Sequence, residues 1–376
     1  MACSSVPLGK APVGERSTPA SKPQSRPPST SSPQANTLMS TPTSREPGAS
    51  LVQGRSRWVP VPWSDLPGFA DDNLYEVWNA WIRSCERVPA PLAELCPEVR
   101  RLSIAGEAAQ RSWMQERLQP YRVESLQGDP EGLLTGYFEP MIEGRRTSTA
   151  EFKFPVYGLP TGLGQRKPWF SRQELDTVQE AQAALRDKVL FYLADPVDAQ
   201  ILQIQGSGRV RIAQEGGAER WVRLGYAGSN DHPHRSVGRW LLDQGLVRDA
   251  SWQGIKQWLQ QNPQRQQELL WVNPRLVFFK ELPPDPQDTV TGPRGAQGAS
   301  LTPGRSIAVD PGSVPLGTPV WISAVGGIQR LVMAQDTGSA IVGGVRADYF
   351  VGTGPQAGEA AGRIRQKLQM WVIWPK

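Results

Sequence analysis

The sequence is poor in residues that bind metals and in long apolar runs. Its 376 residues include two His and three Cys. His232 and His234 lie far from Cys3, Cys85 and Cys96 and have no Cys at zinc-ligand spacing, so we expect no metal site. No stretch approaches the roughly 20 apolar residues of a transmembrane helix, and the N-terminus lacks the apolar core of a signal peptide.

The first 50 residues contain no Phe, Trp or Tyr, and half of them are Ser, Thr or Pro. Such a segment cannot bury enough apolar area to offset the entropy of ordering, so we expect residues 1–55 to form a disordered tether. Cys3 follows a small residue and precedes this linker, as the first Cys of a mature bacterial lipoprotein does. If translation begins upstream, we expect Cys3 to be lipidated; if Met1 is the true start, Cys3 is an incidental thiol.

Net charge is also small in the remainder of the chain. The formal charge is +5, and residues 1–50 contribute +3 from five Lys or Arg and two Asp or Glu, which leaves +2 for the rest. A nucleic-acid-binding protein carries a basic stripe with interleaved aromatics, so we expect no nucleic-acid partner. By contrast, 35 Pro, 37 Gly and 14 Trp are many, and they favour an architecture rich in loops and strands.

The apolar pattern changes along the chain from helical to strand-like. Residues 66–124 repeat apolar positions at helical spacing and predict packing helices. Residues 132–144 predict a strand that ends in a turn at Pro140, and "QILQIQGSGRVRI", residues 200–212, predicts a strand as well. From residue 306 onward, short strands separated by Gly and Pro turns predict a closed or nearly closed barrel.

Cys85 and Cys96 are close in sequence within the predicted helical region. In an oxidising compartment they could close a short disulfide loop. Two buried thiols would fit the sequence equally well, so the pattern leaves both alternatives open.

Several motifs resemble, in the same order, those of the membrane-bound lytic murein transglycosylase A family. The likeness covers roughly residues 60–376. The motifs are "TGYFEP" (135–140), "LQIQGSGRVRI" (202–212), "RSVGRWLLDQG" (235–245), "NPRLVFF" (273–279), "GAQGASLTPGRSIAVDPGSVPLGTPVWI" (295–322) and "AQDTGSAIVGGVRADYFVGTGPQAGEAAGRIRQKLQMWVI" (334–373). The last segment is similar to the small 3D domain, named for three aspartates, which here would be Asp310, Asp336 and Asp348.

The resemblance implies a mainly β fold with some helices, in which a double-psi β-barrel carries an inserted, smaller β-rich domain and a glycan groove lies between them. Residues 56–140 would be the first part of the barrel domain, with N-terminal helices. Residues 141–272 would be the inserted glycan-binding domain. Residues 273–376 would complete the barrel with the catalytic 3D domain. We expect a monomer that acts on peptidoglycan glycan strands in the bacterial cell envelope, at the periplasmic side and associated with the outer membrane.

The resemblance also implies a reaction. Lytic transglycosylases cut the β-1,4 bond from N-acetylmuramic acid to N-acetylglucosamine without water and leave a 1,6-anhydro ring. Ordinary glycosidases need two carboxylates. Here the C6 hydroxyl of the sugar is the nucleophile, so one carboxyl can first protonate the leaving oxygen and then accept the hydroxyl proton, without a cofactor. The resemblance assigns this role to Asp348, whose apolar neighbours Ala347, Tyr349, Phe350 and Val351 favour a raised pKa.

The other site residues are expected to support Asp348 or to contact substrate. Asp336 and Asp310 would be supporting carboxylates that accept backbone N–H bonds. The motifs that line the groove of the family imply these substrate-binding residues: Tyr137, Glu139, Gln205, Gly206, Ser207 and Gly208.

Two rival functions remain at this stage. Residues 336–339, "DTGS", are similar to the loop of an aspartic protease, but such an enzyme needs a second loop of this kind or a homodimer, and this chain has no second Asp-Thr/Ser-Gly loop. A peptidoglycan-binding or wall-remodelling barrel without catalytic activity is the more serious alternative. The release of 1,6-anhydro muropeptides would distinguish the enzyme from it.

Overall fold

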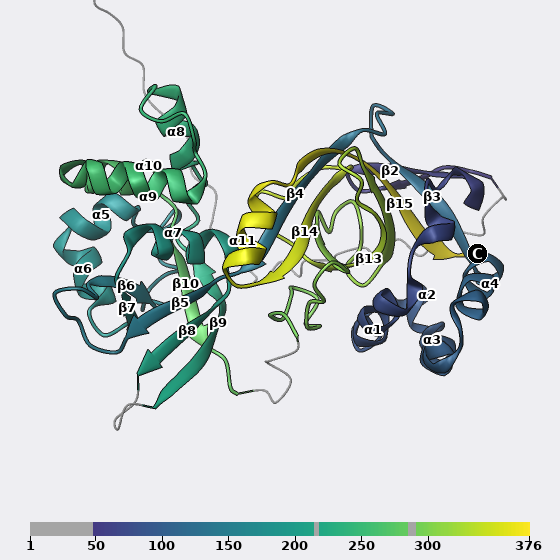
Figure 1. Cartoon of the computed structure of the whole chain (residues 1–376), viewed down its shortest axis with the longest axis horizontal. Helices are drawn as coiled ribbons and strands as arrows, with labels where there is room; N and C mark the ends of the chain where they lie inside the picture. The colour runs from purple at the N-terminus through teal and green to yellow at the C-terminus, as the bar shows by residue number, and fades with distance from the viewer. Residues whose placement is uncertain (1–47, 214–217, 285–290) are drawn as a thin grey trace, which may run out of the picture. The chain divides into compact units, whose positions relative to one another are not determined.

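The computed structural model describes residues 48–213, 218–284 and 291–376. Cys3 and its expected lipidation lie outside these residues. All described residues belong to one compact unit, Glu46–Lys376, and they form two sheets with flanking helices (Figure 1). Among them, no helix combines the length and the apolar character needed to cross a bilayer.

The first sheet draws its strands from both ends of the chain. Its order is β1-β2-β3-β15-β12-β13-β11-β14-β4, and an additional pairing of β15 with β4 closes a barrel of β4, β14, β11, β13, β12 and β15. The β11–β13 and β14–β4 ladders are parallel and the others antiparallel. This closure confirms the predicted barrel. The strands are β1 (Leu51–Gln53), β2 (Ser56–Pro60), β3 (Leu118–Ser125), β4 (Gly132–Glu139), β11 (Ser306–Val309), β12 (Pro319–Ala324), β13 (Gln329–Asp336), β14 (Arg346–Thr353) and β15 (Arg365–Pro375).

Two predictions for this part of the chain were wrong in detail. The helical region ends before residue 118, because β3 pairs with β2 and β15 and buries Leu118, Tyr121 and Val123. The expected tether, residues 1–55, includes β1, which is held by its pairing with β2. Pairing between segments distant in sequence therefore overrides the local pattern at both places.

The second sheet has the order β10-β9-β8-β5-β7-β6. It includes β10, from the motif that we placed in the barrel part beginning at residue 273, because β10 pairs with β9. Helices α7 to α10 share a buried apolar cluster with α11 (Pro355–Gly362). The elements are β5 (Met141–Arg145), β6 (Phe154–Tyr157), α5 (Arg172–Thr177), α6 (Gln179–Leu185), β7 (Val189–Leu193), α7 (Pro196–Gln205), β8 (Gly208–Ala213), β9 (Glu219–Ser229), α8 (Val237–Asp243), α9 (Trp252–Gln261), α10 (Gln266–Val272) and β10 (Val277–Glu281).

Helix α7 replaces the first half of the strand predicted over residues 200–212. The side chain of Asp195 accepts a hydrogen bond from the Val197 N–H at 2.7 Å, and Pro196 occupies the first turn, so the helix has a strong start. Gly206 ends it in the left-handed conformation with φ 75°. The helix thus delivers Gln205 and the following glycine to the place where β8 begins.

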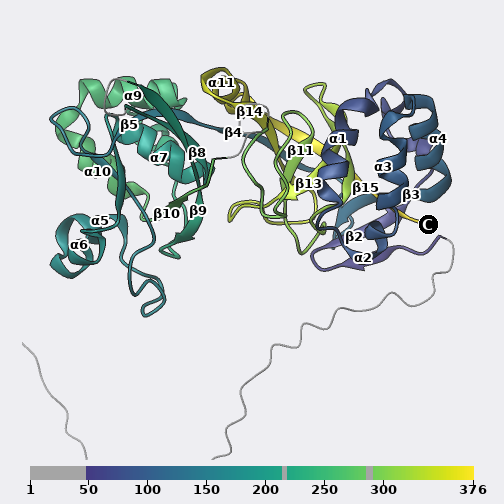
Figure 2. The same cartoon turned by 90° about the horizontal axis from the view of Figure 1, so that it is seen from below.

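Helices near the N-terminus pack on the barrel (Figure 2). They are α1 (Leu74–Ser84), α2 (Ala90–Ala93), α3 (Cys96–Arg101) and α4 (Glu107–Arg117). Trp78, Trp81 and Trp113 lie with ring centroids 5.3–5.8 Å apart in the core beneath these helices. Cys85 and Cys96 form a disulfide, which resolves the alternative that the sequence left open.

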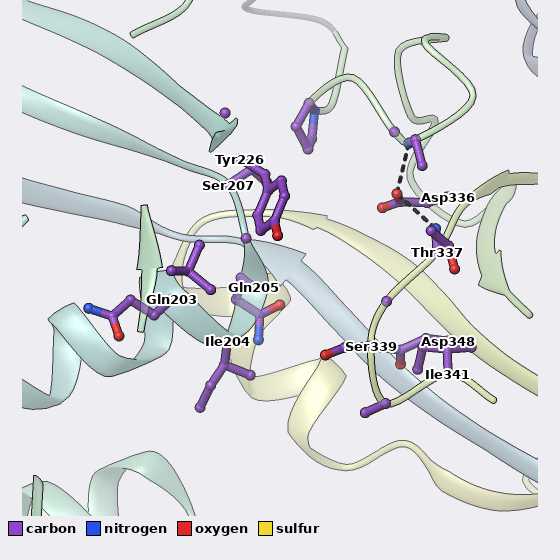
Figure 3. Close-up of a pocket in the computed structure, with 18 of the residues that line it drawn as sticks. Gln203, Ile204, Gln205, Ser207, Tyr226, Asp336, Thr337, Ser339, Ile341 and Asp348 are labelled. Atoms are coloured by element: carbon purple, nitrogen blue, oxygen red, sulfur yellow. Dashed lines mark hydrogen bonds between the residues drawn. The ribbon is translucent and has the colours of Figure 1, made fainter. Parts of the chain in front are cut away.

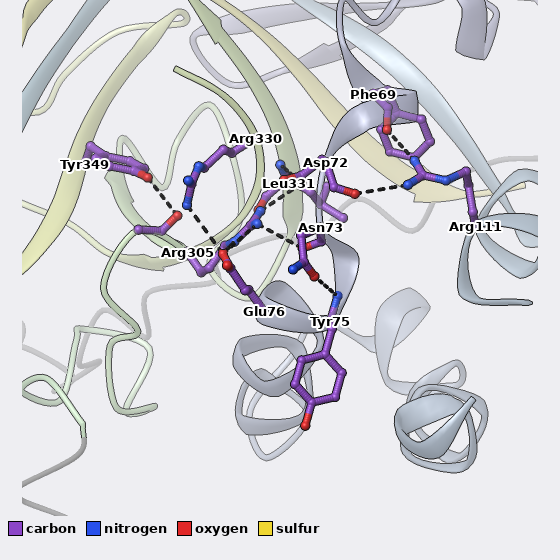
Figure 4. A network of polar contacts seen from close by, with 11 residues as sticks. Phe69, Asp72, Asn73, Tyr75, Glu76, Arg111, Arg305, Arg330, Leu331 and Tyr349 are labelled. Atoms are coloured by element: carbon purple, nitrogen blue, oxygen red, sulfur yellow. Dashed lines mark hydrogen bonds and ion pairs between the residues drawn. The ribbon is translucent and has the colours of Figure 1, made fainter. Parts of the chain in front are cut away.

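A buried guanidinium fastens α1 to the barrel (Figure 4). Arg305 is 1% exposed. It donates to the Asp72 carboxylate at 2.8 Å, to Glu76 at 2.9 Å and to the Leu331 carbonyl at 3.0 Å. Because the buried charge is compensated on several sides, this contact fixes the helices without leaving an unpaired ion in the core.

Candidate active site

A cavity of about 820 Å³ lies between the barrel and the second sheet (Figure 3). Its volume falls in the range of roughly 300–1,000 Å³ that is typical of ligand sites. Figure 3 shows Asp336 and Asp348 on the barrel side, whereas Gln205, Ser207 and Tyr226 come from α7, the turn after it and β9.

The structure brings together most, but not all, of the residues expected at the site. Asp336, Asp348, Gln205, Gly206 and Ser207 line the cavity. Tyr137 lies behind it in contact with Asp336, while Glu139, Gly208 and Asp310 are not among the lining residues. Gly208 is a packing position, because a Cβ there would lie 2.4 Å from the Leu202 side chain.

Asp348 is held in the middle of the barrel by its strand. It lies on β14, directly opposite Thr135 of β4 and Ala308 of β11. Burial raises the pKa of the Asp348 carboxyl, although the Thr135 hydroxyl and the Arg346 charge act in the opposite direction. A carboxyl that lines a cavity and has a raised pKa is suited to carry a proton to a ligand.

The hydrogen bonds around Asp348 have a defined direction. The Thr135 hydroxyl lies 2.5 Å from Asp348 Oδ1, and Arg346 donates to the same hydroxyl oxygen at 2.8 Å. Arginine can only donate, so Thr135 accepts from Arg346 and keeps its own proton for Oδ1, a bond that favours the ionised form of Asp348. The other oxygen, Oδ2, forms no hydrogen bond with any residue in the described ranges, so a proton on Oδ2 leaves the contact with Thr135 intact.

Asp336 has a different environment at the end of β13. Its Oδ1 accepts from the N–H groups of Ala296 and Thr337, both at 2.9 Å, and its Oδ2 accepts from the Tyr137 hydroxyl at 3.1 Å. Burial raises its pKa to about 6 against these hydrogen bonds, and the charge of Asp348 adds to the rise. Both oxygens are used as acceptors, and neither bonds a second carboxyl among the described residues. The proton-sharing pair of an aspartic protease is therefore not formed.

Tyr137 is a partly buried hydrogen-bond donor. Burial and the charges of Asp336 and Asp348 raise its pKa well above its usual value. It therefore remains protonated and donates to Asp336. Its ring centroid lies 5.3 Å from that of Phe350, so the side chain is also held by packing.

Asp310 is a structural carboxylate. It accepts from the N–H groups of Gly343 at 2.8 Å and Gly312 at 2.9 Å, and from Arg55 at 3.1 Å. Burial alone would raise its pKa, but these donors outweigh burial and lower it. An ionised Asp310 thus ties two barrel loops together away from the cavity.

Glu139 does not contact the cavity, and its expected role in substrate binding was wrong. Its side chain is fully buried. It accepts from Arg223 at 2.8 Å, from Arg209 at 2.9 Å and from the Thr353 hydroxyl at 3.0 Å. Both guanidiniums also donate to the Thr291 carbonyl. This cluster joins the end of β4 to β8 and β9, so Glu139 connects the two sheets.

Gln205 links the cavity to β4. Its side-chain oxygen accepts from the Phe138 N–H at 3.0 Å, which leaves the amide nitrogen without a hydrogen bond to any described residue. Since Gln205 lines the cavity, that nitrogen is a donor available to a polar ligand. Among the described residues, no group of three or more His, Cys, Asp or Glu could hold a metal ion.

The sequence analysis missed Thr135 and Arg346, which set the direction of the hydrogen bonds at Asp348. One signal was present, because Thr135, Tyr137 and Glu139 alternate along "TGYFEP" and must share a face of the strand. The parallel pairing of β4 with β14, which joins residues 213 positions apart, left no local signal.

Two family models match this chain. One, described as the MltA specific insert domain, matches residues 133–280, and the other, described as the 3D domain, matches residues 305–374. The first covers the second sheet from β5 to β10 together with β4, and the second covers the barrel strands β11 to β15.

Named relatives carry the comparison further. The membrane-bound lytic murein transglycosylase A of Escherichia coli (strain K12) is 34% identical over 253 residues, which are 64% of this chain and 64% of that protein. The chain thus aligns with somewhat less than two thirds of the length of this curated relative.

Solved structures resemble the chain over more of its length. A lytic transglycosylase, LtgG, of Burkholderia pseudomallei is 38% identical with a TM-score of 0.60, covering 89% of this chain and 98% of that one. MltA from Neisseria gonorrhoeae, in its monoclinic form, is 29% identical with a TM-score of 0.72, covering 87% and 95%. Escherichia coli MltA with bound chitohexaose is 25% identical with a TM-score of 0.66, covering 89% and 99%.

The barrel, the second sheet and the cavity with its two aspartates define a class of proteins, the lytic transglycosylases with a double-psi barrel and an inserted domain. Within this class, the chain belongs to the family of membrane-bound lytic murein transglycosylase A.

Proposed function

We propose that this protein is a lytic transglycosylase that cleaves the β-1,4 bond from N-acetylmuramic acid to N-acetylglucosamine in peptidoglycan and leaves 1,6-anhydro-N-acetylmuramic acid. The observation that carries the proposal is Asp348, whose carboxyl has a raised pKa and a free Oδ2 in the cavity of a chain of this family. The chitohexaose bound to the Escherichia coli relative supports a glycan ligand.

In this mechanism Asp348 acts twice. Its Oδ2 proton passes to the glycosidic oxygen as the bond to the anomeric carbon breaks. The resulting carboxylate accepts the proton of the C6 hydroxyl as that oxygen attacks the anomeric carbon. The nucleophile belongs to the same sugar, so its effective concentration is high and no second carboxylate is needed to activate water.

Asp336 supports the transition state without transferring a proton. Three donors fix its carboxyl, and with a pKa of about 6 it is mostly ionised at neutral pH. A fixed negative charge in the cavity favours the positive charge that develops on the sugar ring. Tyr137 contributes by holding Asp336, whereas Gln205, Gly206 and Ser207 contact the glycan.

The proposed location is the bacterial cell envelope. The Cys85–Cys96 disulfide fits an oxidising compartment, and the relatives named above include membrane-bound enzymes. Lipidation of Cys3 would supply the anchor, and several acyl chains would hold the protein firmly. Expression with its upstream region, followed by mass spectrometry of the membrane fraction, tests this. An intact Met1 on protein recovered free in the cytoplasm would contradict it.

Digestion of purified peptidoglycan tests the activity itself. We expect the wild-type protein to release 1,6-anhydro muropeptides and the Asp348→Asn variant to bind the same material without releasing them. Binding by both proteins with no products from either would favour a wall-binding protein without catalytic activity.

A further inference from the structure

The cavity that contains Asp348 has an excess of positive charge. Its carboxyls are Asp336 and Asp348, and the pKa of each is raised. The Lys and Arg residues that line it are Arg275, Lys280, Arg294 and Arg346. Among these, Arg346 is engaged with Thr135. A neutral sugar chain needs no such excess of positive charge, so Arg275 and Lys280 favour a ligand that carries negative charge.

Lys280 and Arg275 have no anionic partner among the described residues. Lys280, on β10, is exposed and forms no hydrogen bond or ion pair with the residues of the described ranges. The adjacent Glu281 does not neutralise it, because that carboxylate pairs with Arg146 at 2.9 Å. Arg275 donates to a backbone carbonyl at 3.0 Å and meets no carboxylate in the described part of the chain.

The pKa of His234 shows that positive charge dominates on this side of the cavity. Burial lowers its pKa, and the charges of Arg275 and Arg172 lower it further. His234 lines the same cavity. Its lowered pKa favours the neutral imidazole, so it adds no positive charge beside Arg275.

A second hollow of about 590 Å³ adjoins the first, and Tyr226 and Lys280 line both. Apolar side chains, including Leu159, Leu190 and Phe279, form much of its wall. Tyr226 is 51% exposed at this junction. A side branch of a ligand that leaves the main cavity here would thus meet Lys280 first and then the apolar wall of the second hollow.

We propose that Lys280 and Arg275 bind a carboxylate of the peptide carried by the glycan, and that the second hollow receives alkyl side chains of that peptide. The proposal rests on the proposed function, because in peptidoglycan the lactyl group of N-acetylmuramic acid bears a short peptide with free carboxylates, whereas the sugar rings are uncharged. Charge-assisted hydrogen bonds from a guanidinium or ammonium to a carboxylate are short and strong. The site therefore distinguishes peptide-bearing glycan from a bare sugar chain.

Binding to three tetrasaccharides tests this, with Asp348→Asn protein as the background so that no ligand is consumed. The ligands are chitotetraose, peptide-free GlcNAc–MurNAc with free lactyl carboxylates, and the same glycan with its peptides. By titration calorimetry we expect the peptide-bearing glycan to bind about tenfold more tightly than chitotetraose. This ratio should fall in 0.5 M salt.

Lys280→Gln and, independently, Arg275→Gln should each lower the same ratio several-fold. Lys153→Gln, which removes an exposed lysine outside the cavity, should leave it as it is. Thermal melting of each variant checks that it is folded, and two separate variants keep the test valid if one fails to fold.

Equal affinity for chitotetraose and the peptide-bearing glycan would overturn the proposal, as would a ratio that neither variant changes. Peptide-free glycan that binds as tightly as the peptide-bearing form would also overturn it, in favour of the lactyl carboxylate. The proposed function fails separately, if wild-type protein releases no 1,6-anhydro products from peptidoglycan whatever the affinities are.

Discussion

The paired strands β4 and β14 carry two carboxyls, Asp348 near the start of β14 and Glu139 at the end of β4. Each carboxyl accepts from a threonine on the opposite strand. Near the start of β14, Thr135 of β4 donates to Asp348 of β14. At its other end, Thr353 of β14 donates to Glu139 of β4. A threonine hydroxyl therefore meets a carboxylate twice across one parallel ladder, once at the cavity and once inside the protein.

The arginines make the difference between the two places. Arg209 and Arg223 pair directly with Glu139 and use both of its oxygens. Arg346 instead bonds the threonine, so Asp348 keeps one oxygen free and its pKa is raised by burial. A carboxyl saturated with cations can only hold structure, whereas one positioned through a neutral hydroxyl can exchange a proton.

Asp348→Asn should produce the largest loss. The amide keeps the size of the side chain and removes its titratable proton, so we expect turnover to fall by about two to four orders of magnitude with little change in melting temperature. Asp336→Asn should cost less activity. Activity of the Asp348→Asn variant near that of wild type, or a larger loss in the Asp336→Asn variant, would reverse the two roles.

Glu139→Gln tests the end of the β4–β14 ladder that is buried inside the protein. It removes the carboxylate that pairs with two largely buried guanidiniums, so unfolding in urea should show a loss of about 3–5 kcal/mol in stability. Glu143→Gln is the matched control, since the Glu143 side chain is 41% exposed and pairs with two partly exposed arginines. Its loss should stay below about 1 kcal/mol. Equal losses in both variants would show that the buried cluster does not hold the sheets.

Thr135→Val tests the end of the ladder that lies at the cavity, next to Asp348. The hydroxyl favours the ionised form of Asp348, so its removal should raise the pKa of that carboxyl and move the falling, high-pH limb of the rate profile to higher pH. We also expect a loss of about tenfold or less in turnover, because the free carboxyl loses its fixed orientation. Thr135→Ser should restore both. An unchanged pH profile, or a Ser variant as impaired as the Val variant, would leave Thr135 with a packing role only.

The smallest effect should come from the titration of Asp336. Its pKa of about 6 in the folded protein exceeds the value of about 3.9 in an unfolded chain. The folded state therefore binds the proton more tightly, and the stability that this contributes is present below about pH 4 and is lost as the pH rises through 6. The melting temperature of wild type relative to Asp336→Asn should accordingly decline over this interval. A constant difference would contradict the shift.

Local patterns in the sequence predicted much of the barrel, because short strands separated by Gly and Pro turns carry their own signal. The family motifs placed Asp348, Asp336 and Gln205 at one site, and all three line the cavity. The same motifs misassigned Glu139, since the arginines that bury it lie 70 and 84 positions further along the chain. Burial of a charge depends on such distant partners, which periodicity does not reveal.

The prediction of secondary structure from the sequence was wrong where tertiary contacts or helix caps decide the conformation. Residues 200–205 combine Ile and Leu with Gln and fit a strand as well as a helix, and the Asp195 cap and the Gly206 ending select the helix α7. Strand β3 follows α4 without a break and is fixed by its pairing with β2 and β15. Both wrongly predicted segments lie outside the strand that carries Asp348, so they do not change the predicted position of the acid.

The most direct test of the central claim is digestion of peptidoglycan in water enriched in ¹⁸O, followed by mass spectrometry of the sugar ends. We predict that wild-type protein releases 1,6-anhydro ends that are one water lighter than hydrolysed ends and contain no ¹⁸O, and that the Asp348→Asn variant releases essentially none. Reducing ends labelled with ¹⁸O, or anhydro ends formed by the Asp348→Asn variant at a rate near that of wild type, would contradict a single carboxyl that serves first as acid and then as base.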